Sequence, residues 1–301
     1  MEKYIRYFRE NKRTVLKVIL IIFIIFVVIQ LLNWRAGQKE EENNQVINTV
    51  DYGQDVGIIS EEQKMPEVYY EEKNVMQLFV QYCNEKNYES AYDLLTDECK
   101  NELYPDIDVF IQNYGDVNFN TKKTCGFQLW TGNTYLVQIR EDVMATGIYN
   151  EDEYLQDYFT VDGDKLYING YINHYVFNEE SAENEGISVR LESIDFFMDY
   201  TKVNIIVTNK TRNEILLDNM KYNTVKLYDA NNIDYDIDAS SVNVDELRVL
   251  PNESKKVSLD FYCTYRESLE LKSLEFKDVI LDYIRYDQGY EVGRTSVTLD
   301  W

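Results

Sequence analysis

One uninterrupted apolar run near the N-terminus constrains this chain more than any other feature. Residues 18–32 read VILIIFIIFVVIQLL, with no charged side chain. Extended to residues 15–34, the run has about 20 residues and spans about 30 Å as a helix, which matches one hydrocarbon core. Lys17 can reach the headgroups along its alkyl stem, and Trp34 stands at an interfacial position. The sequence therefore predicts a transmembrane helix over residues 15–34.

The charges on either side of this run predict its orientation. Residues 1–17 hold six basic and two acidic side chains, a net charge of +4, whereas the whole chain carries −24. Basic flanks stay in the cytoplasm, so residues 1–14 are predicted to be a cytoplasmic basic segment and the C-terminal part to be extracellular. Tyr4, Ile5 and Phe8 fall on one side of this segment, which leaves an amphipathic helix on the inner leaflet as an alternative to a plain topology determinant.

A cleaved signal peptide is the competing interpretation, because it also combines a basic start with an apolar run. The best cleavage position follows Ala36, but bulky Trp34 then stands three residues before the cut. No cysteine directly follows the run, which excludes a lipoprotein signal. We expect an uncleaved anchor, and a mature N-terminus near Gly37 in mass spectrometry would contradict this.

Composition and spacing divide the remainder into modules. Residues 35–66 are polar and acidic without apolar periodicity, which predicts a solvated acidic linker. Residues 67–176 show helical spacing and then strand alternation, which predicts an α+β domain. Residues 177–186 (FNEESAENEG) are expected to be a second linker, and residues 187–301 a β-sandwich.

The expected elements follow from this periodicity. Helices are predicted in residues 67–115, one bearing Val75, Phe79 and Cys83, a second bearing Ala91 and Leu95, and a third capped by Asp106. Strands are predicted over residues 126–130, 134–140, 143–149, 158–161 and 165–172, and then over 187–197, 202–209, 224–228, 234–237, 254–262 and 273–283.

Two resemblances add to this picture. Lys86-Asn87-Tyr88, Ala91-Tyr92-Asp93-Leu94-Leu95 and Phe110 resemble the helical opening of the cone-shaped fold named after nuclear transport factor two (NTF2-like). Leu227-Tyr-Asp-Ala-Asn-Asn and Leu250-Pro-Asn-Glu-Ser resemble an immunoglobulin-like domain of low-GC Gram-positive surface proteins and lipoproteins. The first resemblance implies helices on a curved antiparallel sheet, as in assembly subunits of conjugation and type IV secretion machines and in stalk domains of cell-wall enzymes.

A search for catalytic chemistry assigns no catalytic or cofactor-binding residue. His174 is the one histidine, and a Ser–His–acid triad would have to use it, but no G-x-S-x-G sequence supplies a nucleophile. We interpret His174 as an ordinary loop or strand-end residue. Phosphate-loop, dinucleotide and H-E-x-x-H motifs are also missing, so we expect no enzyme and no cofactor.

Metal and nucleic-acid binding are likewise not expected. The acidic run Asp229–Asp238 (DANNIDYDID) fails the calcium-loop template, because Ile233 stands at its fifth position. It is predicted to be a hairpin with an acidic outer face, although weak cation binding stays open. No basic patch occurs outside residues 1–17, which argues against nucleic-acid partners.

Two sets of side chains keep alternatives open. Four tyrosines on predicted strands either line a pocket or belong to the core: Tyr135, Tyr149, Tyr158 and Tyr167. Four cysteines occur without a C-x-x-C pair: Cys83, Cys99, Cys125 and Cys263. Cys83 and Cys99 could form a disulfide outside the cell, but buried free thiols are favoured.

The sequence thus predicts a non-catalytic interaction or scaffold protein of the bacterial cell envelope, anchored by one helix. Its partners would be the membrane and envelope proteins, with homo-oligomerisation open, and a conjugation or secretion assembly factor is one form of this role. The alternative is a small-ligand-binding or sensing protein that uses a deep pocket in residues 67–176.

Overall fold

The computed structural model describes residues 67–147, 154–220 and 224–301, which all belong to one compact unit. The predicted cytoplasmic segment, transmembrane helix and acidic linker, residues 1–66, lie outside the described residues, as does Tyr149. None of the helices in the described part is long and apolar enough to cross a membrane. Helices precede an antiparallel sheet and further antiparallel sheets follow, so the α+β fold class is confirmed.

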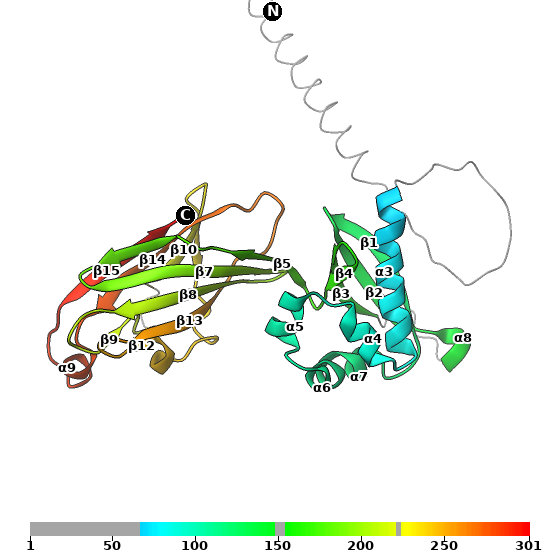
Figure 1. The fold of residues 1–301 in the computed structure, drawn as a ribbon, viewed down its shortest axis with the longest axis horizontal. Helices are drawn as coiled ribbons and strands as arrows, with labels where there is room; N and C mark the ends of the chain where they lie inside the picture. Colours follow the sequence, from blue (N-terminus) through cyan, green and yellow to red (C-terminus); the bar gives the residue numbers. More distant parts are fainter. Residues whose placement is uncertain (1–66, 148–153, 221–223) are drawn as a thin grey trace, which may run out of the picture. The chain divides into compact units, whose positions relative to one another are not determined.

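The helical layer starts with α3 (Glu67–Asn84), which lies beside the first sheet in Figure 1. The second predicted helix is divided, because the Thr96 hydroxyl accepts from the Cys99 N–H and starts a new helix. Asp106 caps the next helix through the Val109 N–H, as predicted. The elements after α3 are α4 (Tyr88–Asp93), α5 (Asp97–Leu103), α6 (Ile107–Phe110), a π-helical turn (Ile111–Gly115) and α7 (Asp116–Asn118).

The first sheet has the antiparallel strand order β1-β2-β3-β4. Its strands are β1 (Lys123–Thr131), β2 (Thr134–Glu141), β3 (Leu155–Asp162) and β4 (Lys165–Tyr167). Alternate side chains face the helices, so that Phe127, Val137 and Phe159 contribute to one core.

The strand predicted over residues 143–149 is wrong in its first half, since α8 (Val143–Thr146) is a short helix. The Asp142 side chain accepts from the backbone N–H groups of Met144 and Ala145, and Gly147 ends the turn with a φ of 70°. This local capping outweighs the strand preference of the β-branched residues.

Residues 171–301 form two sheets that share a second core. The first contains β5 (Tyr171–Val176), β6 (Ser181–Asn184), β7 (Ile187–Phe197), β8 (Thr201–Asn209) and β13 (Ser254–Phe261). The second contains β9 (Ile215–Leu216), β10 (Val225–Asp229), β11 (Asp234–Asp236), β12 (Arg248–Val249), β14 (Leu271–Ile280) and β15 (Arg294–Asp300). A 3₁₀ turn (Val244–Leu247) and the short α9 (Tyr283–Asp287) connect some of these strands.

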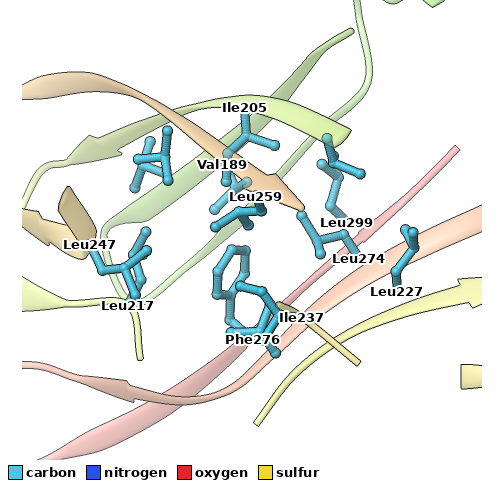
Figure 2. Close-up of a cluster of buried hydrophobic side chains, with 14 of the residues drawn as sticks. Val189, Ile205, Leu217, Leu227, Ile237, Leu247, Leu259, Leu274, Phe276 and Leu299 are labelled. Carbon is cyan, nitrogen blue, oxygen red and sulfur yellow. The ribbon is translucent and has the colours of Figure 1, made fainter. Parts of the chain in front are cut away.

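The side chains between these two sheets are aliphatic and aromatic (Figure 2). Val189, Ile205 and Leu259 come from β7, β8 and β13, and meet Leu274 and Phe276 of β14. Two sheets packed through one apolar layer agree with the predicted sandwich arrangement.

Two predicted boundaries are corrected by the sheet pairing. The strand predicted over residues 165–172 is interrupted by a turn at Asn169 and Gly170, which have φ of 59° and 70°. After this turn β5 leaves the first sheet and pairs with β7. The predicted linker over residues 177–186 contains β6, which also pairs with β7.

Candidate functional site

Aromatic rings fill the space between the helices and the first sheet. Phe110 lies within ring-contact distance of Phe79, Tyr88, Tyr92, Tyr104 and Tyr114, with centroids 5.4–6.2 Å apart. Tyr135 and Tyr167 are buried in the same core, which confirms the core alternative for these two tyrosines. Tyr158 is half-buried and contacts Trp130 edge-on. These side chains fill the core between the helices and the first sheet, where the ligand-binding alternative requires a deep pocket.

One carboxylate, Asp157 of β3, faces this core. Its oxygens accept from the Tyr114 hydroxyl at 2.7 Å and from the backbone N–H groups of Tyr158, Asn169 and Gly170. Burial raises the pKa of Asp157 to about 6, although these hydrogen bonds oppose the shift. Because the donors include the turn between β4 and β5, Asp157 fixes the point at which the chain passes from the first sheet to the next.

His174 belongs to a polar row that crosses one sheet from β5 to β13. Its Nδ1 lies 2.6 Å from Asp195 Oδ1, and Tyr171 donates to the same oxygen. Asn204 donates to Asp195 Oδ2 at 2.7 Å. Ser258 in turn donates to Asn204 Oδ1 at 2.6 Å, and Ser193 lies 3.0 Å from Asn204 Nδ2. His174 is therefore more than the ordinary strand-end residue of the sequence interpretation, since it faces a buried acid.

Among the residues that the structure describes, no nucleophile of this row is placed against the His174 ring. Ser193 and Ser258 both contact Asn204, and among the described residues no hydroxyl or thiol is bonded to the His174 ring. Hydrogen bonding to Asp195 raises the pKa of His174 above its usual value, against the effect of burial. Burial would raise the pKa of Asp195, but the hydrogen bonds from His174 and Tyr171 outweigh it and lower that pKa. The arrangement can hold a charged pair but has no group placed for acyl transfer.

The raised pKa of His174 predicts that this residue contributes to stability in a pH-dependent way. Because the pKa of His174 is raised in the folded state, protonated His174 stabilises the fold. This contribution to the free energy of unfolding is complete below the unfolded-state pKa of about 6.5 and is lost as the pH rises through the folded-state pKa. The carboxylates of Asp195, Glu98 and Glu102 all raise the pKa of His174. We expect the melting temperature of the native chain to fall more steeply above pH 6.5 than that of His174→Asn.

Asn can donate to Asp195 without titrating, so the difference between the two pH profiles isolates the His174 charge. Asp157 titrates at about pH 6 in both proteins and therefore cancels in this difference. Parallel profiles above pH 6.5 would contradict the prediction.

The acidic run Asp229–Asp238 forms the predicted hairpin of β10 and β11. Its carboxylates are bonded within the protein: Asp234 and Asp236 pair with Lys226, and Asp229 pairs with Arg266 at 2.9 Å. A hollow of about 440 Å³ lies beside it, lined by Asp218, Asp236 and Asp238 among others. Within the described residues, no cluster of three potential metal ligands occurs.

All four cysteines are free, as favoured by the sequence interpretation. Cys83, Cys99 and Cys263 are buried, and burial raises the pKa of Cys99 and of half-buried Cys125 to about 12. These thiols are protonated at neutral pH.

In the part of the chain that the structure describes, the edge of the first sheet at β1 is open. In an antiparallel pair, alternate residues direct both backbone groups away from the partner strand. Asn84 bonds to both the N–H and the C=O of Lys123, at 2.8 and 2.9 Å, so Lys123 points outward. The same parity directs the backbone groups of Cys125, Phe127 and Leu129 outward. No backbone bond from the described residues reaches these groups.

The opposite edge of this sheet is covered. At β4, the Leu166 N–H donates to the Leu94 C=O at 2.8 Å, and the Leu166 C=O accepts from the Thr96 N–H at 3.0 Å. The segment between α4 and α5 thus takes the position of a further strand. Within the described ranges β4 is covered in this way and β1 is not, so β1 presents an edge of this sheet at which a strand can be added.

A groove of about 430 Å³ runs between α3 and the β1 edge. Its apolar wall is formed by Val80, Cys125 and Phe127, and its polar wall includes Gln77 and Gln81. A site that binds an added strand needs two features: unpaired backbone N–H and C=O groups at a sheet edge, and a groove beside that edge. The backbone hydrogen bonds give affinity, and the groove accepts alternate side chains of the added strand.

Sequence reasoning missed Asp157, Asp195 and the β1 edge. The two acids had a detectable signal, since Asp157 stands at an alternate position between the apolar residues Leu155 and Phe159, and Asp195 lies between apolar neighbours. The edge had none, because strand order does not follow from strand sequence. Comparisons with protein-family models, with curated proteins and with solved structures gave no match for this chain.

Proposed function

We propose that this chain is a single-pass, membrane-anchored interaction protein of the bacterial cell envelope, with no catalytic activity, whose folded region binds another protein through the β1 edge. The observation that carries the proposal is the open edge at Cys125, Phe127 and Leu129 beside the α3 groove. The apolar run over residues 15–34 and its charged flanks support the anchor and the extracellular position of the folded region.

We also propose that residues 67–176 adopt an NTF2-like cone and that residues 187–301 adopt an immunoglobulin-like sandwich. Helices packed on an antiparallel sheet, followed by two sheets with a common core, are compatible with both. A role as an assembly factor of a conjugation or secretion machine would be one form of this function. The ligand-binding alternative has less support, since aromatic side chains fill the region where its pocket would lie.

Site-specific photo-crosslinking in intact cells tests the proposed function. A photoreactive phenylalanine analogue replaces Leu129, which is 51% exposed at the edge. A matched probe replaces Leu250, which is 53% exposed in the two-sheet part of the chain. We expect a light-dependent adduct with an envelope protein or a second copy from position 129 and none from position 250. Adducts from neither position, or equally from both, would contradict the proposed edge.

A further inference from the structure

We infer that the occupant of the β1 edge is β1 of a second copy of this chain, paired antiparallel about Phe127. This inference rests on the proposed interaction function and names its partner. The two first sheets would then join edge to edge into one continuous sheet. Such a pair is isologous, because each copy presents the same surface to the other.

The backbone parity of β1 suits this arrangement. Cys125, Phe127 and Leu129 direct their N–H and C=O groups outward, and they are spaced symmetrically about Phe127. In the antiparallel pair Phe127 opposes the second copy's Phe127, and Cys125 opposes the second copy's Leu129. All of these are hydrogen-bonded pairs, so every outward group from residue 125 to residue 129 gains a partner. The strand is regular over this stretch, since its register shift comes only between Leu129 and Thr131.

The side chains fit the groove. Residues 125, 127 and 129 lie on the face of the sheet that carries α3, because Cys125 and Phe127 line the groove against that helix. In a paired strand the second copy's Phe127 projects to the same face. It therefore enters the groove beside Val80 and Phe127, and the exposed Leu129 gains an apolar neighbour in Cys125 of the second copy.

The charges favour self-association at this edge over other surfaces. The chain carries −24, so two copies repel each other in general. Residues 121–131 (TKKTCGFQLWT) contain no acid, and their charged residues are Lys122 and Lys123. Lys123 pairs with Glu141 at 2.5 Å and Lys122 pairs with Asp142 at 3.5 Å within the same chain, so the charge at this strand end is locally balanced. Two copies of this edge therefore meet with less repulsion than two acidic surfaces of the chain would.

Membrane anchoring would strengthen this pairing. One pair of edge strands buries little surface compared with a standard protein interface. Copies confined to one membrane meet at a high effective concentration, which raises the occupancy of a weak contact. The test therefore uses the full chain in cells.

Disulfide trapping tests the register. The variant Leu129→Cys places a new thiol opposite Cys125 of the second copy. The Cα atoms of a hydrogen-bonded antiparallel pair are about 5.5 Å apart, within the disulfide range of about 4.4–6.8 Å. After mild oxidation of cells that produce two differently tagged forms, we expect a covalent dimer that carries both tags and disappears on reduction.

Matched variants separate this register from nonspecific oxidation. Leu129→Cys combined with Cys125→Ser should give no dimer, and Gln128→Cys should give none because its thiol projects to the other face opposite Gly126. Phe127→Pro removes one outward N–H without breaking a bond to β2, and in the Leu129→Cys background it should abolish the dimer. Unchanged hydrogen exchange in β2 and β3 would show that this last variant is folded.

The outcomes distinguish this inference from the proposed function. A dimer that depends on both Cys125 and the new thiol supports the pairing. No such dimer, together with a crosslink from position 129 to a different envelope protein, overturns the second-copy inference and leaves the interaction function standing. No dimer and no crosslink from position 129 overturns both.

Discussion

Replacing Asp195 by alanine is expected to lower the free energy of unfolding by about 3–5 kcal/mol, as for other buried charge pairs that lose one partner. The Asp195 side chain is 3% exposed and accepts hydrogen bonds from His174, Tyr171 and Asn204. Its removal takes the acceptor from His174 and Tyr171 and one of two acceptors from Asn204, in a place that water reaches poorly, so the loss exceeds that of a single hydrogen bond.

Hydrogen exchange of the full chain measures this loss at the amides of β5, β7 and β8. Asp199→Ala is the matched control, because Asp199 lies four residues away, is exposed, and gives the same change in charge. We expect that control to change protection by less than about 0.5 kcal/mol. If the two variants lowered protection equally, the polar row would have no special role in stability.

Replacing Phe110 by alanine is expected to cost about 3–5 kcal/mol, the usual range for deleting a buried aromatic side chain. Phe110 is fully buried, and the rings of Phe79, Tyr88, Tyr92, Tyr104 and Tyr114 surround it. These rings come from several helices, so the helical layer cannot collapse onto the vacated volume without moving whole elements.

The effect should be confined to the helical layer and the first sheet. Hydrogen exchange should accelerate in α3 and β2, while the core in Figure 2 keeps its protection. Val117→Ala, at a side chain that is 58% exposed, is the control and should have little effect. Equal acceleration across both cores would mean that they unfold as one cooperative unit.

The sequence predicted those elements whose pattern is set by burial. β7 and β8 are buried at most positions, with half-buried residues at several alternate positions, and their predicted ranges agree with the structure to within one residue. β6 was not predicted, because Ser181–Asn184 is largely solvated and shows no alternation. The residue preferences of α8 predicted a strand, but the structure has a helix there. In a segment of four residues, the single cap from Asp142 has more effect than these preferences.

The candidate sites were harder to predict for a different reason. His174 was identified, but Asp195, its partner, lies 21 residues away on a neighbouring strand. The pairing of His174 with Asp195 depends on the register of β5 against β7, which includes the shift between Tyr171 and Asn173. The β1 edge depends on strand order, and on Leu94–Thr96 covering the other side of the sheet.

That covering segment limits how far any assembly can grow. Because Leu94–Thr96 occupies the β4 side, each first sheet is monovalent for strand addition. Once β1 is occupied, the joined sheet ends on both sides in a closed edge. Crowding many copies at a membrane therefore raises the number of pairs but offers these sheets no route to an open-ended β-fibril.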